Sequence, residues 1–273
     1  PWLDRRRPGQ NKYTTQRKEL DKVKILSGTF EGVTTGTPIQ LFIENKDHRS
    51  KDYTEIANTF RPGHADLAGV HKYGFGDIRN ILERSSARET TMRVALGSVC
   101  RKLLEDVGIY IGSRVVQIHN VKDESNYKLT PDEMNERADI SPVRCLDDNA
   151  EKEMINVIDD AKKAGDSVGG VFEVIATGVP YGLGSYTQWN NKLQARISTM
   201  MMSINAFKGI EIGSGFKSAS QFGSNVHDEI GYENGKFTRH TNNAGGIEGG
   251  MSNAQPIVLW MSMKPISTLI KPL

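Results

Sequence analysis

The pattern of hydrophobic and polar residues predicts both helices and strands along this chain of 273 residues. Apolar residues recur every three or four positions in 90–107, 149–164 and 190–205, which is the spacing of one face of an α-helix. Gly108 and Gly165 follow the first two segments and predict where these helices end. We therefore expect three amphipathic helices whose apolar faces lie against a core.

Strand signals lie between and around these helices. Six strands are predicted: 23–28, 38–44, 110–121, 169–177, the short strand 209–213, and 257–263. The fourth is apolar on both faces, which is typical of a sheet that is covered on both sides. Strands and helices do not alternate in a regular βα repeat. The pattern therefore predicts an α+β fold, with helices packed against antiparallel sheets, and the length allows one large domain or two small ones.

Shorter segments carry local signals of their own. Thr130 and Glu133 have the spacing of a capping box, with Pro131 at the first helical position, and predict a short polar helix at the surface. The Asn-Gly pair at 234–235 lies between aromatic residues and predicts a hairpin turn. Residues 213–224 are rich in glycine and serine, and we expect a flexible segment there.

Composition restricts the possible functions. A net charge of +2 is too small for a general nucleic-acid binder, and the basic run 5–7 lacks interleaved aromatic residues. No apolar run has the length of a membrane span and no signal peptide is visible, so we expect a cytoplasmic protein. Cys100 and Cys145 stand far apart and predict no metal site; Cys100 is expected to be a small core residue.

Candidate chemistry gathers in residues 61–97, where arginines, one histidine and hydroxyl groups stand together. Pro62 fixes its own φ and keeps Arg61 out of a helix, while Gly63 allows the backbone to approach a ligand closely. His64 is therefore presented on a rigid turn. Taken singly, each residue has an ordinary interpretation, as a solvated arginine or a hydrogen-bonded structural histidine. The cluster favours a binding site.

The end of this stretch adds an anion-binding signal. Ser85 or Ser86 is placed to cap the helix that follows, and the free N–H groups at the start of a helix favour anions. Because Arg84 and Arg88 flank these serines, we expect an anionic, phosphorylated ligand.

Two later stretches carry similar chemistry. Residues 239–255 contain four glycines in two pairs and three asparagines, which suits close approach to a bound molecule, although a glycine-rich surface loop is the alternative. Residues 264–268 place a lysine and two hydroxyls on a proline-stiffened turn, which suits an anionic head group. A Rossmann site is excluded because no Gly-x-Gly-x-x-Gly joins a strand to a helix.

Five blocks of the sequence resemble, in the same order, the signature blocks of the chorismate synthase family. These blocks are Arg61–Asp66, Arg84–Thr90, Ser203–Gly209, Asn242–Met251 and Met263–Thr268. The resemblance extends over essentially all 273 residues, and it is specific because several long blocks contribute to it.

The resemblance implies a homotetrameric enzyme of the shikimate pathway. The family converts 5-enolpyruvylshikimate 3-phosphate to chorismate by a 1,4-elimination of phosphate and a ring proton. It requires reduced FMN, although the reaction has no net redox change, and some members also use NADPH. The family fold is a sandwich of helices between antiparallel β-sheets, which agrees with the pattern above.

The resemblance also implies site residues. His64 is the catalytic residue, to which the family mechanism gives protonation of the reduced flavin. The implied substrate-binding residues are Arg17, Arg61 and Arg88. The implied flavin-binding residues are Arg84, Ser85, Ser86, Asn205, Ala206, Gly249, Lys264, Pro265, Ile266, Ser267 and Thr268. Arg6 and Lys12 align with positions ascribed to NADPH, with Lys12 standing where arginine is common.

The family pattern extends beyond this sequence at both ends. Family members begin with a Gly-Glu-Ser-His-Gly segment whose histidine assists departure of the phosphate, and they end with a region carrying an arginine and an aspartate beside the flavin. Because neither is among these residues, we expect a single domain over residues 1–273 that is truncated at both ends, with weak activity or none and with impaired ligand binding. Two other functions remain open: a catalytically incomplete core that binds FMN or a phosphate ligand, and an NADPH-dependent flavin reductase.

Overall fold

The computed structural model describes residues 2–7, 13, 19–46, 59–74 and 76–271, so the predicted site residues Lys12 and Arg17 lie outside the described part. The chain divides into two compact units, residues 1–102 and 103–273, and each is described by itself. This division does not test the single domain expected over the whole chain, which stays a prediction. Within the described residues, no helix is long and apolar enough to cross a membrane.

The first unit combines helices with a two-stranded ribbon. Its elements are α1 (Trp2–Arg6), β1 (Val23–Ser27), β2 (Thr29–Phe30), β3 (Val33–Thr34), β4 (Gln40–Ile43), α2 (Asp66–Tyr73), α3 (Arg79–Ser85), the 3-10 turn η2 (Ala87–Glu89) and α4 (Thr90–Asp106), whose last residues belong to the second unit. Helices α2 and α3 pack closely, because a Cβ at Gly69 would stand only 2.7 Å from Ile81 Cγ2.

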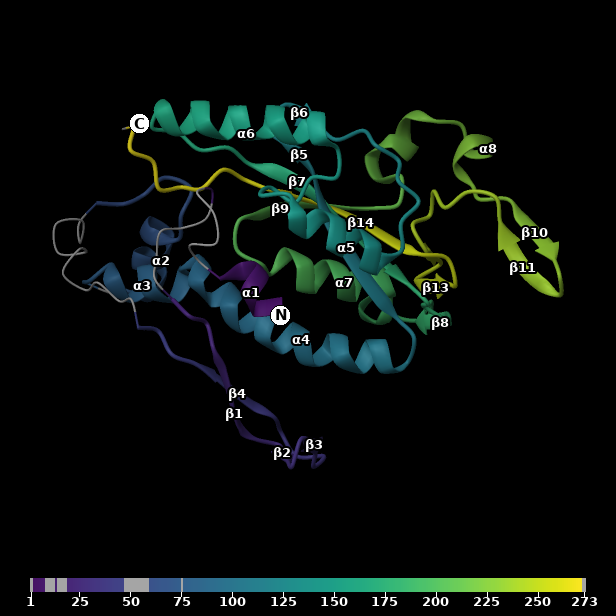
Figure 1. The fold of residues 1–273 in the computed structure, drawn as a ribbon, viewed down its shortest axis with the longest axis horizontal. Helices are drawn as coiled ribbons and strands as arrows, with labels where there is room; N and C mark the ends of the chain where they lie inside the picture. The colour runs from purple at the N-terminus through teal and green to yellow at the C-terminus, as the bar shows by residue number, and fades with distance from the viewer. Residues whose placement is uncertain (1, 8–12, 14–18, 47–58, 75, 272–273) are drawn as a thin grey trace. The chain divides into compact units, whose positions relative to one another are not determined.

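The ribbon confirms the two strands predicted at 23–28 and 38–44. β1 pairs antiparallel with β4, and β2 with β3 (Figure 1). All five residues of β1 are exposed, and Phe30 and Val33 near the tip are 70% and 68% exposed. An isolated pair of strands is only marginally stable in water, and packing against another surface would stabilise it. Exposed apolar patches commonly mark interaction sites, so this ribbon is a candidate surface for a partner.

Helix α4 confirms the helix predicted before Gly108, but its apolar stripe does not face the core. Leu96 is 54% exposed and Leu103 is 66% exposed, while the buried residues are Thr91 and Ala95. Cys100 is exposed as well, so its expected place in the core is wrong. Periodicity identifies an apolar helix face, but it does not say whether the same chain covers that face.

The second unit carries the larger sheet. Its elements are β5 (Tyr110–Ile118), β6 (Val121–Lys122), α5 (Pro131–Ile140), α6 (Asp148–Lys163), β7 (Gly170–Thr177), β8 (Tyr181–Gly184), the 3-10 turn η3 (Trp189–Asn191), α7 (Leu193–Met202), β9 (Phe207–Ile212), the 3-10 helix η4 (Gly215–Ser220), α8 (Gly223–Val226), β10 (Ile230–Glu233), β11 (Lys236–Arg239), β12 (Ile247–Glu248), β13 (Met251–Asn253) and β14 (Ile257–Met263). Antiparallel pairs give a five-stranded sheet in the order β6-β5-β7-β14-β9 and a three-stranded sheet in the order β12-β13-β8.

Both faces of the five-stranded sheet are covered, as the apolar strand at 169–177 predicted. On one face, Val174 belongs to the core cluster that includes Leu259 of β14 and Ile197 of α7. On the other face, Ile175 packs against Met134 and Ala138 of α5. Because α7 also contacts β13 of the three-stranded sheet, it lies between two antiparallel sheets. The predicted α+β class, with helices between antiparallel sheets, is confirmed.

Local signals in this unit were confirmed in part. Thr130 and Glu133 form the capping box, and the turn at 234–235 joins β10 to β11. Helix α5 buries Met134 and Asn135, so it is not the purely surface helix expected from its polar composition. The segment 213–224, expected to be flexible, contains η4 and the start of α8, because turn-by-turn backbone hydrogen bonds order it.

Candidate active site

In the first unit, the turn from Arg61 to Asp66 joins three of its side chains through one carboxylate. Asp66 is the first residue of α2, and its side chain is fully buried. Its Oδ2 accepts hydrogen bonds from Nε and from the backbone N–H of Arg61, both at 3.0 Å. Gly63 has a φ of +73°, a left-handed conformation that glycine adopts without strain, and it lets the chain turn back.

His64 lies inside this cluster. Its Nδ1 is in close contact with Oδ1 of Asp66, and Nη2 of Arg61 lies 3.1 Å from Nδ1 and 3.4 Å from Nε2. The imidazole is 19% exposed, so it is sheltered but still within reach of a ligand. The turn that the sequence predicts is therefore built around Asp66, a residue for which the sequence predicts no role.

The electrostatics of Asp66 follow from its donors. Burial by itself would raise the pKa of Asp66, but hydrogen bonds from Arg61 and His64 outweigh burial and lower the pKa of this carboxyl below its usual value. Asp66 is therefore ionised near neutral pH, and it compensates the positive charge of Arg61.

A second cluster of charged residues in this unit pairs Arg88 and Arg6 with the carboxylates of Glu19 and Asp21. Nη2 of Arg88 lies 2.5 Å from Oδ1 of Asp21, as an ion pair without hydrogen-bond geometry, and 3.7 Å from Oε2 of Glu19. Arg6 reaches the same Asp21 at 3.8 Å and donates from Nε to Thr90 Oγ1 at 3.1 Å. The side chains of Glu19 and Asp21 are 1% and 0% exposed. Two buried carboxylates thus balance two guanidinium groups that the sequence assigns to ligands.

The two serines before α4 have different roles. Ser86 caps η2, because its Oγ accepts a hydrogen bond from the backbone N–H of Arg88 at 3.2 Å. Ser85 donates from Oγ to the carbonyl oxygen of Ile81 at 2.6 Å, within its own helix. Arg84 beside them is exposed. The predicted cap is therefore Ser86.

In the second unit, two predicted flavin-binding segments come together. The backbone N–H of Lys264 donates to the carbonyl oxygen of Ala206 at 3.0 Å, and Nζ of Lys264 donates to Ser267 Oγ at 2.7 Å. Ala206 has a φ of +71°, which is uncommon for a residue with a side chain and is typical of functional turns. Residues 205–206 and 264–268 therefore form one surface with an ammonium group and hydroxyls.

Gly249 lies apart from that surface. It forms the turn between β12 and β13 with a φ of +58°, and the carbonyl oxygen of the next residue, Gly250, accepts a hydrogen bond from the backbone N–H of Leu193 at 2.8 Å. Leu193 begins α7, whereas Ala206 follows the end of α7. Gly249 is thus next to a residue bonded to the start of α7, whereas Lys264 is bonded to the segment after its end, and a helix of this length spans about 15 Å.

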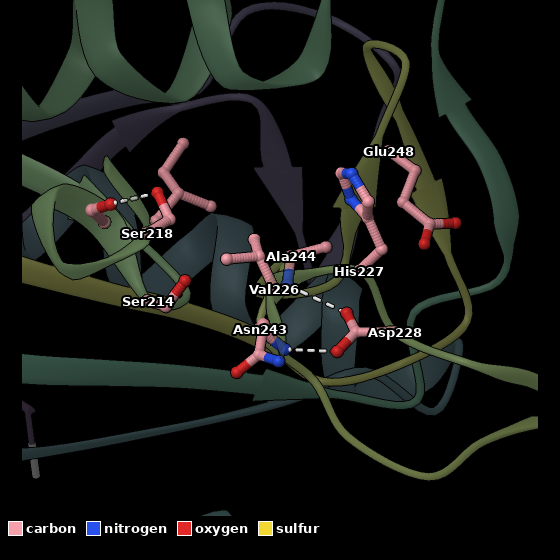
Figure 2. Close-up of a pocket in the computed structure, with 10 residues that line it drawn as sticks. Ser214, Ser218, Val226, His227, Asp228, Asn243, Ala244 and Glu248 are labelled. Atoms are coloured by element: carbon pink, nitrogen blue, oxygen red, sulfur yellow. Dashed lines mark hydrogen bonds between the residues drawn. The ribbon is translucent and has the colours of Figure 1, made fainter. Parts of the chain in front are cut away.

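A cavity of about 310 Å³ lies between the segment 212–228 and the glycine-rich stretch 239–255 (Figure 2). Asp228 organises its floor by accepting hydrogen bonds from Thr241 Oγ1 and from the backbone N–H groups of Asn243 and Ala244, at 2.5, 2.7 and 2.9 Å. Burial alone would raise the pKa of Asp228, and these three hydrogen bonds lower it on balance. Residues 226–228 were not predicted as part of a site, although a His-Asp pair before a predicted hairpin is a signal that the sequence contains.

These geometries indicate what each cluster does. The Arg61–His64–Asp66 cluster combines a proton-transfer group with a cation, and the Lys264 surface offers a cation and hydroxyls. Among the described residues, no group of three or more histidine, cysteine or acidic side chains is placed to hold a metal ion. An α+β fold with these two sites defines an enzyme that handles anionic small molecules.

Comparisons with known proteins identify the family. The sequence profile described as chorismate synthase matches residues 1–273. The chain is 48% identical to chorismate synthase 2 of Bacillus cereus and to chorismate synthase of Listeria welshimeri; each alignment covers 99% of this chain and 74% of the relative. A solved structure titled as the crystal structure of chorismate synthase superposes with a TM-score of 0.79 at 47% identity, covering 90% of this chain and 71% of the other. The chain belongs to the chorismate synthase family, whose members are phosphate-eliminating lyases of the shikimate pathway.

Proposed function

We propose that this chain converts 5-enolpyruvylshikimate 3-phosphate to chorismate, with reduced FMN bound beside the substrate. In this reaction the carbon–oxygen bond to phosphate breaks, a ring proton leaves, and inorganic phosphate is released. The observation that carries the proposal is the Arg61–His64–Asp66 cluster around a buried carboxylate, found in a chain that is 48% identical to named chorismate synthases.

The charges of the substrate explain the arginines. A molecule with one phosphate and two carboxylates needs several cations, and the planar guanidinium group offers paired hydrogen bonds to such groups. Arg61 and Arg88 would bind these anions, with Arg17 as a third cation outside the described residues. Because Asp66 and Asp21 hold Arg61 and Arg88 in place, little side-chain entropy is lost when an anion binds.

Lys264 and its neighbours fit the flavin. An ammonium group, the hydroxyls of Ser267 and Thr268, and the turn at Ala206 form a donor set of the kind that holds a phosphate-bearing cofactor. Asn205, Pro265 and Ile266 would complete that surface. The family resemblance also implies flavin contacts for Arg84, Ser85, Ser86 and Gly249. When bound, reduced FMN supplies the electron-rich partner for an elimination without net redox change.

His64 would hold and deliver a proton in the proposed reaction. Its Nδ1 is engaged by Asp66, so Nε2 is the ring nitrogen from which a proton is exchanged. Arg61 lies against the same ring and places positive charge where negative charge must be stabilised. His64 therefore combines a fixed orientation with a charged neighbour.

NADPH is a second candidate cofactor. Arg6, one of the two residues assigned to it, donates to Thr90 Oγ1 at 3.1 Å and to the carbonyl oxygen of Ala87 at 3.2 Å, so its guanidinium group is already engaged in the structure. Binding of NADPH through Arg6 therefore requires those bonds to be exchanged. Lys12, the other residue, lies outside the described part.

We also propose a homotetramer in the cytoplasm. The apolar ribbon 23–43 and the exposed stripe of α4 are surfaces that an assembly would cover. A second copy of the chain is the partner that the family resemblance implies.

Anaerobic turnover tests the proposal. The purified chain is mixed with 5-enolpyruvylshikimate 3-phosphate and chemically reduced FMN, and chorismate is measured by its absorbance after separation. Chorismate formation that is abolished in His64→Ala supports the proposal. Flavin binding without chorismate would support the incomplete binding core instead, and NADPH oxidation by the chain alone would support the reductase.

A further inference from the structure

We propose that Asp66 is a positioning residue that selects the tautomer of His64 and holds Arg61 beside it. The proposal rests on the proposed role of His64 in the reaction. Asp66 touches neither substrate nor cofactor in this account, and it acts through the imidazole.

The two oxygens of Asp66 have separate partners. Oδ2 accepts two hydrogen bonds from Arg61, from the backbone N–H and from Nε, each at 3.0 Å. Oδ1 faces Nδ1 of His64 in close contact, and Nη2 of Arg61 lies 3.4 Å from Oδ1. One carboxylate therefore fixes both the guanidinium and the imidazole, on a turn that Pro62 and Gly63 already restrict.

These partners determine where the histidine proton lies. An ionised carboxylate only accepts hydrogen bonds, so Nδ1 must carry the hydrogen that points at Asp66. Arg61 only donates, and its Nη2 lies near both ring nitrogens, 3.1 Å from Nδ1 and 3.4 Å from Nε2. Because Nδ1 donates its hydrogen to Asp66, Nε2 is the ring nitrogen that keeps a lone pair. The contact with Asp66 therefore selects the neutral form that is protonated on Nδ1 and has its lone pair on Nε2.

The helix context separates this role from ordinary capping. An acidic residue in the first turn of a helix commonly bonds the free amides of its own helix. The N-cap of α2 is Ala65, and no side-chain capping hydrogen bond is formed there. The Asp66 carboxylate instead contacts the side chains of Arg61 and His64, which precede α2. Its burial is thus used to organise the turn.

The variant Asp66→Asn changes the tautomer for a geometric reason. An asparagine has one acceptor oxygen, and Arg61 presents two donors on the Oδ2 side. The amide oxygen will face Arg61, so the amide NH₂ will face His64 and Nδ1 must then accept. The neutral ring of His64 then becomes protonated on Nε2. The substitution keeps the shape of the side chain at position 66 and removes one negative charge.

Nitrogen NMR on protein labelled with ¹⁵N-histidine tests this directly, at about pH 8.5 where a histidine is largely neutral. The chain has six histidines, and loss of one signal in His64→Asn assigns the resonance. We expect the Nδ1-protonated form in the wild-type protein and the Nε2-protonated form in Asp66→Asn. A wild-type ring protonated on Nε2 overturns the proposal, even if the variant does not fold.

Steady-state kinetics provide the second readout. We expect kcat of Asp66→Asn to fall by roughly 10²- to 10⁴-fold, as for a general acid held in the wrong tautomer, while KM for the substrate changes less than about threefold. Asp77→Asn is the matched control, because it removes an acid–arginine pair with Arg79 that is exposed and outside the site. Its kcat and its histidine spectrum should match the wild-type protein.

The outcomes separate the two proposals. If the wild-type protein forms no chorismate, the proposed function fails, while the ¹⁵N spectrum still decides whether Asp66 sets the tautomer. An Asp66→Asn protein with unchanged tautomer, or with unchanged kcat, shows that Asp66 does not position His64.

Discussion

The backbone N–H of Lys264 bonds the carbonyl oxygen of Ala206 at 3.0 Å and joins two segments that are distant in sequence. This contact places the ammonium group of Lys264, which bonds Ser267 Oγ at 2.7 Å, beside a turn in the left-handed conformation. Backbone geometry rather than side-chain reach therefore builds the surface to which we assign the flavin.

The variant Lys264→Met tests that surface. Loss of the ammonium group removes a charge-assisted hydrogen bond to an anionic cofactor, and we expect FMN affinity to fall by roughly 10- to 100-fold. Quenching of flavin fluorescence on titration measures the change. Lys163→Met, on an exposed lysine of α6 that pairs with Asp160, is the control and should bind FMN like the wild-type protein. An unchanged affinity of Lys264→Met for FMN would show that Lys264 does not bind the cofactor.

Arg88 should contribute to stability as well as to binding. In Arg88→Ala, the buried carboxylates of Asp21 and Glu19 lose the guanidinium group that lies 2.5 Å from Asp21 and 3.7 Å from Glu19. Among the contacts described, Arg6 then remains near Asp21 at 3.8 Å. Uncompensated buried charge is costly, and we expect the free energy of unfolding in urea to fall by about 3 kcal/mol. Arg84→Ala, on an exposed side chain, should change it by less than about 0.5 kcal/mol. Similar small losses in both variants would contradict the buried network.

The two cysteines should differ sharply in reactivity. Cys100 is exposed, whereas burial, with the nearby carboxylate of Asp123, raises the pKa of Cys145 to about 11. We expect a thiol reagent at neutral pH to label Cys100 alone in the native protein and both residues after unfolding in urea. Peptide mass spectrometry locates the label, and Cys100→Ser is the control that should remain unlabelled when folded. Rapid native labelling of Cys145 would contradict its burial.

Acid should destabilise the second unit through Asp123. Burial alone would raise the pKa of Asp123, but hydrogen bonds from Ser125, the charge of Arg114 and the backbone N–H of Leu146 lower it on balance. A depressed folded-state pKa contributes stability that is fully present above the unfolded value of about 3.9 and is lost as pH falls through the folded value. We therefore expect the free energy of unfolding to decrease steadily below about pH 4.

The variant Asp123→Asn isolates this contribution. It should be less stable than the wild-type protein at neutral pH, because Arg114 then keeps only Glu173 as an acidic partner at 2.7 Å among the contacts described. Its stability should also change less between pH 4 and pH 2, in urea unfolding monitored by circular dichroism, since one titrating group is gone. An unchanged slope would mean that other carboxyls produce the acid effect.

The sequence predicts the elements whose signals are local. The capping box at Thr130, the glycine after α4 and the turn at 234–235 each act within a few residues, and the structure confirms them. The signature blocks likewise point to the family, because each is a continuous run. These signals depend on backbone preferences that hold wherever the segment lies.

What the sequence does not predict depends on contacts between distant residues or on the surroundings of an element. Asp66 stands two positions after His64, but only coordinates show that its carboxylate faces the ring. Asp228 organises the loop at 243–244 from across a hairpin. The apolar stripe of α4 correctly predicts a helix, but the prediction that the stripe is buried in the core is wrong. The same periodicity occurs in a helix that faces its own core and in one that faces another chain.

The apolar ribbon should control assembly of the chain. Phe30 is 70% exposed near its tip, and a charge there would oppose burial against a second copy. We expect Phe30→Asp to shift the protein from tetramer towards smaller species in size-exclusion chromatography with light scattering, with little change in the unfolding of the isolated chain. Ile140→Asp is the matched control, because this residue at the end of α5 is 85% exposed outside the ribbon. A tetramer that persists in Phe30→Asp, or one that dissociates equally in Ile140→Asp, would show that the ribbon does not hold the copies together.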